Sequence, residues 1–352
     1  MTNYIKKDIR TLSVEDLKVF FESNNIETYR ANQIYEWLWV KGVSDFNLMT
    51  NLSIDFRKFL QKYFTINNIK VESIQKSIDG TIKNAVKLYD NKIVESVLIP
   101  TKNRITACIS SQVGCSLNCK FCATSKLKRL RNLNVDEIFD QVKFIDNQSK
   151  SFYNRPITNI VYMGMGEPLM NYENVIKSIE KITSKSGLGF SPRRITVSSV
   201  GFPKFIKKMA DQKIKFNLAI SLHSAIQSVR EFLMPFSNKI LIEDLIDSLR
   251  YWINIKKSII TFEYIVFDGI NDSEKDIIEL IKICKKIPSK VNLIQYNSIN
   301  DDNFRNASIK SINRYAKLLS ENNIINTIRK SRGDDIDAAC GQLANNTLNL
   351  KN

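Results

Sequence analysis

Three cysteines with close, regular spacing are the residues of this chain whose chemistry is easiest to read. Cys115, Cys119 and Cys122 follow the pattern Cys-x3-Cys-x2-Cys. Thiolates this close in sequence can converge on one metal centre at little cost in loop closure. A structural zinc site or an ordinary iron–sulfur cluster takes four protein ligands, so three ligands leave a position open for a substrate or cosubstrate. Spacing alone leaves two alternatives open: a zinc site completed by a distant ligand, and three unrelated thiols.

The other three cysteines differ in their surroundings. Cys284 lies in an apolar helical pattern, and we expect it to pack in the core. Cys108 lies in an apolar segment just before the three-cysteine motif. Cys340 lies in a loop that contains glycines and acidic residues, 332–343, where packing does not explain a cysteine. A loop thiol can become a thiolate and reach a pocket, so Cys340 is a candidate nucleophile.

Two further residues stand out by type. Glu95 shares one face of an expected strand, 93–99, with apolar side chains. It is therefore either at a solvated edge or buried with a raised pKa suited to acid–base chemistry, and the residues alone favour the edge. His223 is the only histidine, which excludes a zinc site with two histidines. A Ser-His-Asp hydrolase is also disfavoured, because the chain has no Gly-x-Ser-x-Gly motif.

The elements that must position these residues fall into three parts. Residues 1–65 show helical periodicity and predict a small helical N-terminal domain, with its aromatic side chains in the core rather than on a base-stacking surface. Residues 66–100 change to a period of two and predict an antiparallel β meander that serves as a linker or extension. Residues 101–345 alternate strand and helix patterns over about six units, which predicts an α/β fold with a parallel sheet and helices outside.

Polar residues recur where the predicted parallel strands end. Such folds bind ligands at the carboxyl ends of their strands. The features at these ends are the three-cysteine motif, the Gly-Met-Gly-Glu-Pro segment 164–168, Ser198, the Ser-Leu-His segment 221–223, and Asn297. Any one of them is explained by a satisfied polar group at a strand end. Together they predict one shared pocket.

The charge of the chain points to a polyanionic partner. The net charge is +16, from 52 basic and 36 acidic residues. Between Lys102 and Arg131 there are seven basic residues and no acidic one, and this run brackets the three-cysteine motif. Lysine and arginine that neutralise phosphates release counterions, so a positive field at a site favours nucleic acid. The alternative is generic surface charge in a lysine-rich chain.

Hydropathy and the N-terminal residues indicate the cellular compartment of the protein. No stretch of about 18 apolar residues exists, so no membrane span is expected. The first residues lack the apolar region of a signal peptide. We therefore expect a cytoplasmic protein whose cysteines are reduced unless their chemistry requires otherwise.

Several of these segments together resemble one family. The cysteine spacing resembles the signature of radical S-adenosylmethionine (SAM) enzymes. The longer motifs resemble those of the RlmN-type dual-specificity RNA adenine-C2 methyltransferases, at residues 110–115, 119–122, 163–169, 220–223 and 332–343. The resemblance covers nearly the whole chain. It implies a partial (β/α)6 TIM-like radical SAM barrel in the 101–345 segment, with the 1–65 domain binding RNA.

The resemblance assigns roles residue by residue. Cys115, Cys119 and Cys122 would hold a [4Fe–4S] cluster. The residues that would bind SAM are Gly166, Glu167, Ser198, Ser221, Leu222, His223 and Asn297. Cys340 would accept a methyl group from a first SAM, and a second SAM would supply the radical that activates this methyl. Cys108 would release the product through a transient disulfide with Cys340, and Glu95 would be the proton acceptor.

The implied substrates are an adenosine in 23S rRNA and an adenosine next to the anticodon of tRNA, each methylated at C2. Adenine C2 is electron-poor, so ordinary electrophilic transfer from SAM does not suit it, whereas a carbon radical can add there. A flavodoxin or ferredoxin reductant and a monomeric protein are also implied. The nearest rival is a C8-specific 23S rRNA adenine methyltransferase that confers antibiotic resistance, although the Arg-Gly-Asp-Asp-Ile-Asp segment before Cys340 favours C2. A rival of another class is a non-catalytic iron–sulfur or zinc RNA-binding module.

Overall fold

One continuous sheet of ten strands organises the molecule. The computed structural model describes residues 6–213, 215–299 and 303–344. The order of the strands across the sheet is β14-β13-β12-β11-β10-β9-β6-β5-β4-β3. Seven neighbouring strands from β6 to β14 pair in parallel, and β3 to β6 pair antiparallel. The sheet therefore joins the predicted partial barrel and the predicted meander through the β5–β6 pair.

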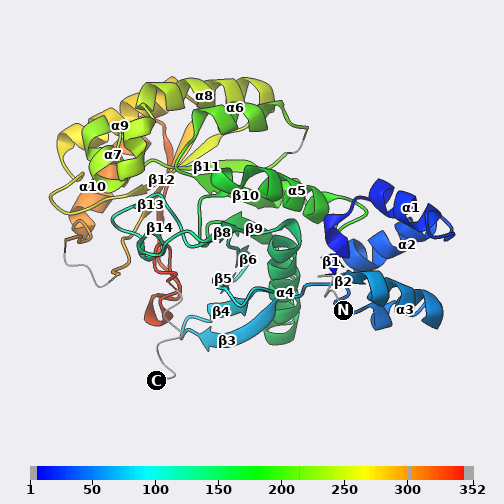
Figure 1. The fold of residues 1–352 in the computed structure, drawn as a ribbon. Coiled ribbons are helices and arrows are strands. Elements are labelled where there is room, and N and C mark those ends of the chain that lie inside the picture. The colour runs from blue at the N-terminus through cyan, green and yellow to red at the C-terminus, as the bar shows by residue number, and fades with distance from the viewer. Residues whose placement is uncertain (1–5, 214, 300–302, 345–352) are drawn as a thin grey trace.

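The parallel strands alternate with helices, as the sequence predicts. The strands are β6 (Ile105–Cys108), β9 (Asn159–Tyr162), β10 (Ile195–Ser199), β11 (Asn217–Ser221), β12 (Ile260–Ile265), β13 (Ser289–Ile294) and β14 (Ile325–Arg329). The helices are α4 (Val135–Tyr153), α5 (Tyr172–Thr183), α6 (Pro203–Asp211), α7 (Gln227–Leu233), α8 (Ile242–Lys256), α9 (Glu274–Lys286) and α10 (Ile309–Glu321). Helices α6, α8, α9 and α10 cover the outside of the strands (Figure 1). The predicted α/β fold, with a parallel sheet and helices outside it, is thus confirmed.

The N-terminal helices pack around buried side chains that are continuous with the main core, where Trp39 meets Phe139 of α4 edge to face. They are α1 (Val14–Glu22), α2 (Arg30–Tyr35), a π-helical continuation (Glu36–Lys41) and α3 (Ile54–Tyr63), with the short strands β1 (Lys7–Asp8) and β2 (Phe64–Thr65) pairing in parallel. Ser13 and Asp16 form a capping box at the start of α1. The helical stretch that begins with α2 ends at Gly42, whose φ is 60°. Phe21 and Phe56 are buried and meet edge to face, in agreement with a packing role for these aromatics.

A buried arginine joins these helices to the barrel. Arg10 binds both carboxylate oxygens of Asp140 on α4 at 2.9 Å and lies 3.2 Å from Asp136 on the same helix. Asp8 of β1 also pairs with Arg10, at 3.4 Å. Burial raises the pKa of Asp136 to about 7, and Arg10 opposes that rise. The ion cluster fixes the N-terminal unit against α4.

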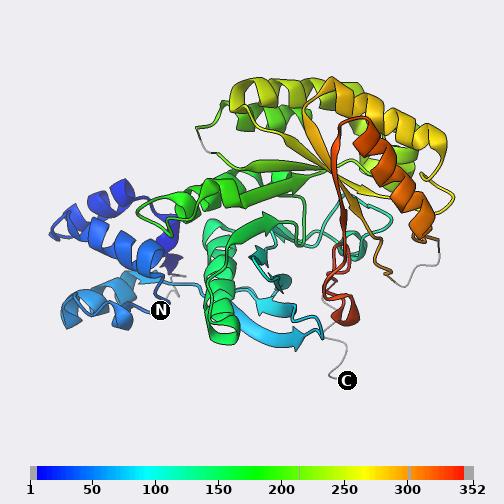
Figure 2. The same cartoon turned by 180° about the vertical axis from the view of Figure 1, so that it is seen from behind.

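The meander packs between α4 and the C-terminal segment. Its strands are β3 (Lys70–Lys76), β4 (Ile82–Lys87) and β5 (Ile93–Pro100). On one face, Asn84 and Gln148 of α4 exchange two side-chain hydrogen bonds of 3.0 and 2.8 Å. On the other side the chain returns after β14 and lies beside β4 and β3 (Figure 1 and Figure 2). The meander is therefore part of the sheet and a platform for that returning segment.

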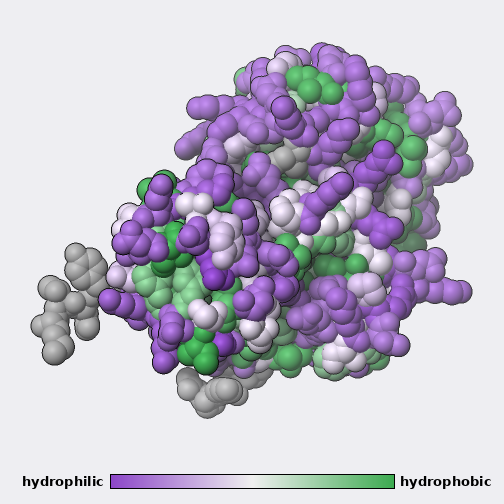
Figure 3. Space-filling model, turned by 90° about the vertical axis from the view of Figure 1, so that its right-hand side faces the viewer, coloured by the Kyte–Doolittle hydropathy of each residue, from purple (hydrophilic) through white to green (hydrophobic). Residues whose placement is uncertain are grey.

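The outer surface is largely hydrophilic. Figure 3 shows this for the face that carries the N-terminal helices, where hydrophobic residues gather only in separate patches. Among the described residues, no helix is both long enough and apolar enough to cross a bilayer.

Candidate active site

Two adjoining cavities lie along the parallel strands. The inner one is at their carboxyl ends, and the outer one extends from there toward their amino ends, where Asn159, Thr196 and Lys290 line it. The inner cavity has a volume of about 170 Å³ and the outer one about 480 Å³. Several expected site residues line the inner cavity: Cys115, Cys119, Cys122, Gly166, Glu167, Ser198, Ser221 and His223. The shared pocket that the strand ends predict is therefore present. Cys340 lines both cavities, while Cys108 lines only the outer one.

The three-cysteine segment is held by backbone contacts on both sides. Gly114 has φ 75°, and a Cβ there would lie 2.4 Å from the carbonyl oxygen of Lys128, so the turn into the motif requires glycine. The amide of Cys115 donates to Leu127 O at 3.3 Å. The hydroxyl of Ser125 donates to Cys122 O at 2.7 Å. These contacts fold the segment into a loop whose thiols face one cavity.

The cysteine thiols fit an iron–sulfur cluster better than a single ion. Burial raises the pKa of Cys115 to about 11 and that of Cys119 well above its ordinary value. Thiolates are therefore stable here only beside added positive charge, which a metal centre supplies. Within the described ranges, no three His, Cys, Asp or Glu side chains are grouped as a single ion requires. Cysteines of a [4Fe–4S] cluster bind different irons, so they need not converge on one point.

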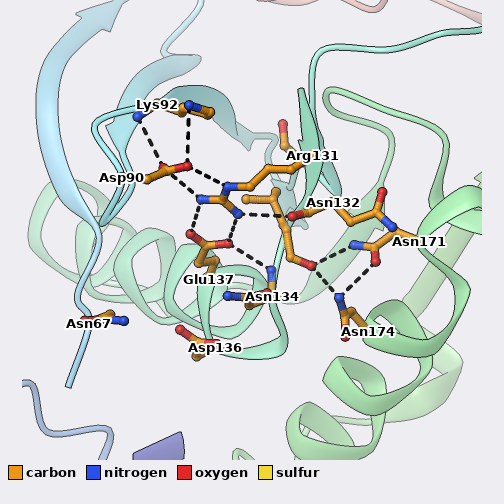
Figure 4. A network of polar contacts seen from close by, with 12 residues as sticks. Asn67, Asp90, Lys92, Arg131, Asn132, Asn134, Asp136, Glu137, Asn171 and Asn174 are labelled. Carbon is orange, nitrogen blue, oxygen red and sulfur yellow. Dashed lines mark hydrogen bonds and ion pairs between the residues drawn. The ribbon is translucent and has the colours of Figure 1, made fainter. Parts of the chain in front are cut away.

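A polar network anchors the base of this loop. Arg131, in the short strand β8 (Arg131–Asn132), binds Glu137 of α4 through two hydrogen bonds of 2.7 Å and Asp90 of the β4–β5 turn at 2.8 and 2.9 Å. Figure 4 shows the guanidinium between the two carboxylates. Strand β8 pairs with β7 (Gln112–Val113), which leads into the three-cysteine motif. The network therefore ties the motif to the meander and to α4.

Glu167 is a buried carboxylate at the wall of the inner cavity. It is 3% exposed, and burial raises its pKa to about 7. Its Oε1 accepts from the Leu169 amide at 2.9 Å and its Oε2 from the Val200 amide at 3.0 Å. Gly166 before it has φ 93°, and a Cβ there would lie 2.4 Å from Cβ of Gln112. This glycine lets the backbone pass close to Gln112 and presents Glu167 to the cavity.

His223 is a neutral hydrogen-bond donor in the same cavity. Its pKa falls to about 3, first because the ring is buried and second because Arg230 lies nearby. Nδ1 accepts a hydrogen bond from the Ile265 amide at 3.2 Å, which leaves the proton on Nε2. The ring packs edge to face on Phe121, with centroids 4.8 Å apart. A lone histidine at a strand end is thus placed to bind rather than to transfer protons.

Two expected SAM contacts lie elsewhere. Leu222 is buried outside both cavities, and its amide donates to Glu263 O at 3.1 Å. Asn297 lines the outer cavity, and its Nδ2 donates to Cys340 O at 3.1 Å. In this structure Asn297 therefore contacts the backbone of the candidate nucleophile.

The two outlying thiols meet at the outer cavity. Both Cys108 and Cys340 line it, although 232 positions separate them in the sequence. Burial raises the pKa of Cys108 to about 12, and Arg329 opposes the rise. All six cysteines, which lie within the described ranges, are free thiols. The disulfide implied by the resemblance is therefore not present in this structure, because both partners are reduced.

The Cys340 loop is docked rather than free. Asp335 accepts hydrogen bonds from the Ser77 hydroxyl at 2.6 Å and the Ile78 amide at 3.1 Å. Asp79 accepts from the Gly333 amide at 3.1 Å. The β3–β4 turn therefore holds the first half of the loop in place. Cys340 itself stays exposed.

Glu95 is buried, not at a solvated edge. It is 0% exposed on β5, and its Oε2 accepts a hydrogen bond from the Ala344 amide at 2.9 Å. The edge interpretation is wrong because the returning C-terminal segment covers this face of the meander. Glu95 lies outside the lining of both cavities, next to the segment that carries Cys340.

Two residues that line both cavities were not among the site residues predicted from the sequence. Glu263 on β12 is 4% exposed, and Arg329 ends β14; both line both cavities. The guanidinium of Arg329 lies 3.9 Å from Glu263 Oε2, and Asn292 donates to Oε1 at 2.9 Å. Glu263 interrupts the otherwise apolar run 260–265, a signal that sequence reasoning missed. The outer cavity is cationic beyond this wall, with Arg104, Lys290, Lys330 and Arg332 in its lining.

Comparison with known proteins agrees with this geometry. Residues 109–281 match the radical SAM superfamily, and residues 7–66 match the ribosomal RNA large subunit methyltransferase N-terminal domain. The chain is 57% identical over 343 residues to a probable dual-specificity RNA methyltransferase RlmN of Flavobacterium psychrophilum, covering 97% of this chain and 99% of that protein. It is 39% identical to the dual-specificity RNA methyltransferase RlmN of Geotalea uraniireducens, with 96% of each chain covered.

A solved structure extends the similarity to three dimensions. A radical SAM methyltransferase from Sphaerobacter thermophilus superposes with a TM-score of 0.89 at 34% identity, covering 96% of this chain and 99% of that one. This chain therefore belongs to the RlmN family of radical SAM RNA methyltransferases.

Proposed function

We propose that this chain methylates C2 of an adenosine in 23S rRNA and of the adenosine next to the anticodon in tRNA, with Cys340 as the methyl carrier. The single observation that carries the proposal is the position of Cys340, which lines both the inner and the outer cavity. A residue that receives a methyl group from one ligand and delivers it to another needs access to both. Cys340 is the only thiol outside the three-cysteine motif with this access among the described residues.

The inner cavity is the proposed site for the cluster and SAM. Cys115, Cys119 and Cys122 would hold the [4Fe–4S] cluster. When bound there, the cluster would supply the electron that turns SAM into a radical source; a first SAM would supply the methyl group and a second the radical. Glu167 and the Nε2–H of His223 offer one acceptor and one donor for the polar groups of SAM. The remaining proposed SAM contacts are Gly166, Ser198, Ser221, Leu222 and Asn297.

Three residues of the chain handle the product. Glu95 would accept the proton that adenine C2 loses. The Cys108 thiolate would then attack the Cys340 sulfur to form a disulfide; the bond between that sulfur and the product carbon would break, and the carbon would keep the electron pair and take up a proton, which leaves the methyl group on the base. Two electrons from the reductant would reopen the disulfide. Both thiols line the outer cavity, which supports this pairing. The proposed reductant is flavodoxin or ferredoxin. The enzyme is further proposed to be monomeric and cytoplasmic.

The outer cavity is the proposed entrance for RNA. Arg104, Lys290, Lys330 and Arg332 provide positive charge for phosphates around a volume of about 480 Å³. An adenine stacked inside a helix cannot reach a thiol at the wall of a cavity, so the target base would be flipped out of its stack. The N-terminal domain, residues 1–65, would hold the RNA by its shape and backbone.

Product analysis tests the proposal. The reconstituted protein is incubated anaerobically with SAM, a reductant and either 23S rRNA fragments or tRNA, and the digested RNA is analysed by mass spectrometry. We expect 2-methyladenosine from both RNAs. An 8-methyl product would refute C2 selectivity. Tight zinc binding without SAM turnover would reject the enzyme in favour of a non-catalytic RNA-binding module.

A further inference from the structure

A buried lysine of the meander faces the Cys340 loop. Lys83 on β4 is 3% exposed, and Lys83 pairs with Val97 of β5. Side chains of directly paired residues share a face, and so does the residue two positions along, Glu95. The opposite face of β4 carries Asn84, which binds α4. Lys83 and Glu95 therefore form a diagonal pair on the face that the returning C-terminal segment covers.

The two side chains hold the loop at both of its ends. The ammonium of Lys83 donates to the carbonyl of Asp337 at 3.4 Å, three positions before Cys340. Glu95 accepts from the amide of Ala344 at 2.9 Å, four positions after Cys340. The Lys83 nitrogen lies 3.7 Å from Glu95 Oε1, so the two anchors are joined by an ion pair.

The surroundings make this pair important for the charge of Glu95. The side chains of Lys83 and Glu95 are 3% and 1% exposed. Among the described residues, the titratable side chains on this face are Lys83 from β4, 3.7 Å from Glu95, and Cys108 from β6, which pairs with Val97; the loop contributes the backbone carbonyl of Asp337. Burial raises the pKa of Cys108 to about 12, so this thiol adds no charge at neutral pH. Lys83 is the cation of this set, and a buried carboxylate without a cation takes up a proton.

We propose that Lys83 is a positioning residue for the reaction: its ammonium keeps Glu95 ionised to accept a proton and tethers the Cys340 loop to the same point. The inference rests on the proposed role of Glu95 and goes beyond it by assigning the group that keeps that base ready. The methyl carrier and the proton acceptor then share one cation, although 245 positions separate Glu95 from Cys340. Other contacts of the loop, at Asp79 and Asp335, remain when Lys83 is replaced.

Charge-changing variants with two separate readouts test this inference. Lys83→Gln keeps a donor for the Asp337 carbonyl but loses the charge; Lys83→Arg keeps the charge. Lys87→Met is the matched control, since Lys87 lies on the same strand, is 35% exposed and pairs with Glu72 at 3.8 Å. One readout is methylation of the Cys340 peptide without RNA, by mass spectrometry. The other is the pH profile of single-turnover formation of methylated RNA.

We expect Lys83→Gln to change Cys340 methylation by less than about threefold, because the other loop contacts remain. In the pH profile of RNA methylation, the rate of Lys83→Gln should fall first at low pH. Without the cation the pKa of Glu95 rises, so the pH at which the rate is half its maximum on the acid side should increase by about one to three units. Lys83→Arg should restore the acid limb, and Lys87→Met should match the unmodified protein. Lys83→Met serves as a second neutral variant if the glutamine variant does not fold.

Two outcomes would overturn the inference. One is an acid limb of Lys83→Gln and Lys83→Met that coincides with that of the unmodified protein. The other is an equal loss in both readouts that Lys83→Arg does not restore, which would mean a purely structural role. Failure of the proposed function gives a different result: the unmodified protein makes no methylated RNA, or Glu95→Gln leaves its formation unchanged.

Discussion

Replacing Arg131 by methionine tests whether the polar network of Figure 4 holds the three-cysteine segment in place. Arg131 is 19% exposed, Glu137 is 2% exposed, and the Arg131 guanidinium satisfies both Glu137 oxygens. Removing the arginine leaves the buried Glu137 with the amide of Asn134, at 2.9 Å in the capping box of α4, as its remaining hydrogen-bond donor among the described residues. The methionine keeps the apolar stem of the side chain, so the change isolates the charge and its hydrogen bonds.

The size of the effect follows from burial. Removing one partner of a buried ion pair costs about 3–5 kcal/mol. Asp90 is 23% exposed, and solvent screens its ion pair with Arg131. We therefore take the lower end of this range of costs, about 3 kcal/mol. An unfolding entropy of about 2.1 cal/mol/K per residue amounts to roughly 0.7 kcal/mol/K for 352 residues. The melting temperature should therefore fall by about 4 °C.

The pH dependence gives a second signature. The hydrogen bonds from Arg131 lower the pKa of Asp90 to about 2. A carboxylate with a lowered pKa stabilises the fold above its unfolded pKa, about 3.9, and this contribution disappears as the pH falls to about 2. The melting temperature of Arg131→Met should therefore lie about 4 °C below that of the unmodified protein at pH 7. This difference should become smaller below about pH 4.

The assay is thermal unfolding followed by circular dichroism under anaerobic conditions, together with the iron content after reconstitution. Arg129→Met is the matched control, because Arg129 lies in the same basic run and is exposed. We expect the control to melt within about 1 °C of the unmodified protein. If Arg131→Met melts as high as the control and takes up iron equally well, the network does not hold the motif and the reasoning fails.

Four further predictions follow from single residues. Cys340→Ala should abolish RNA methylation while iron and SAM still bind; normal methylation would rule out the carrier role. Cys108→Ala should accumulate a covalent protein–RNA adduct on denaturing gels, and free product release would contradict its resolving role. Gly166→Ala should weaken SAM binding at least tenfold by calorimetry, whereas Gly189→Ala, also at positive φ but with open space around it, should not. The imidazole NMR signals of His223, the only histidine, should not titrate between pH 5 and 9, because burial lowers its pKa to about 3.

Much of the fold follows from local pattern. The alternation of strands and helices predicts the parallel barrel, and the change to a period of two predicts the meander. Capping residues such as Ser13 mark helix starts because they satisfy the first free amides within a few residues. The pairing of β5 with β6, however, joins the two parts into one sheet, and periodicity carries no information about which strand neighbours which.

The candidate site is predictable only where its residues lie at strand ends. Glu167 and His223 follow strands directly, so the parallel topology brings them together. Glu95 was misjudged from the residues alone because its burial depends on a segment some 250 positions later, whose Ala344 amide binds it. Glu263 was missed because a single acidic residue within an apolar strand has no local signature that separates a cavity wall from a satisfied core group.

These contacts explain why the meander belongs to the active site although it contributes nothing to the barrel's parallel strands. The barrel provides the inner cavity, but Cys340 lies after the last strand, where no parallel pairing can position it. The β3–β4 turn binds the loop at Asp335, and Lys83 and Glu95 bind it on either side of the thiol. A loop fixed at both sides needs little reorganisation to keep its thiol at the boundary of two cavities, and that would lower the entropic cost of each proposed methyl transfer. Lengthening the β3–β4 turn should therefore impair Cys340 methylation even though it leaves every cavity-lining residue unchanged.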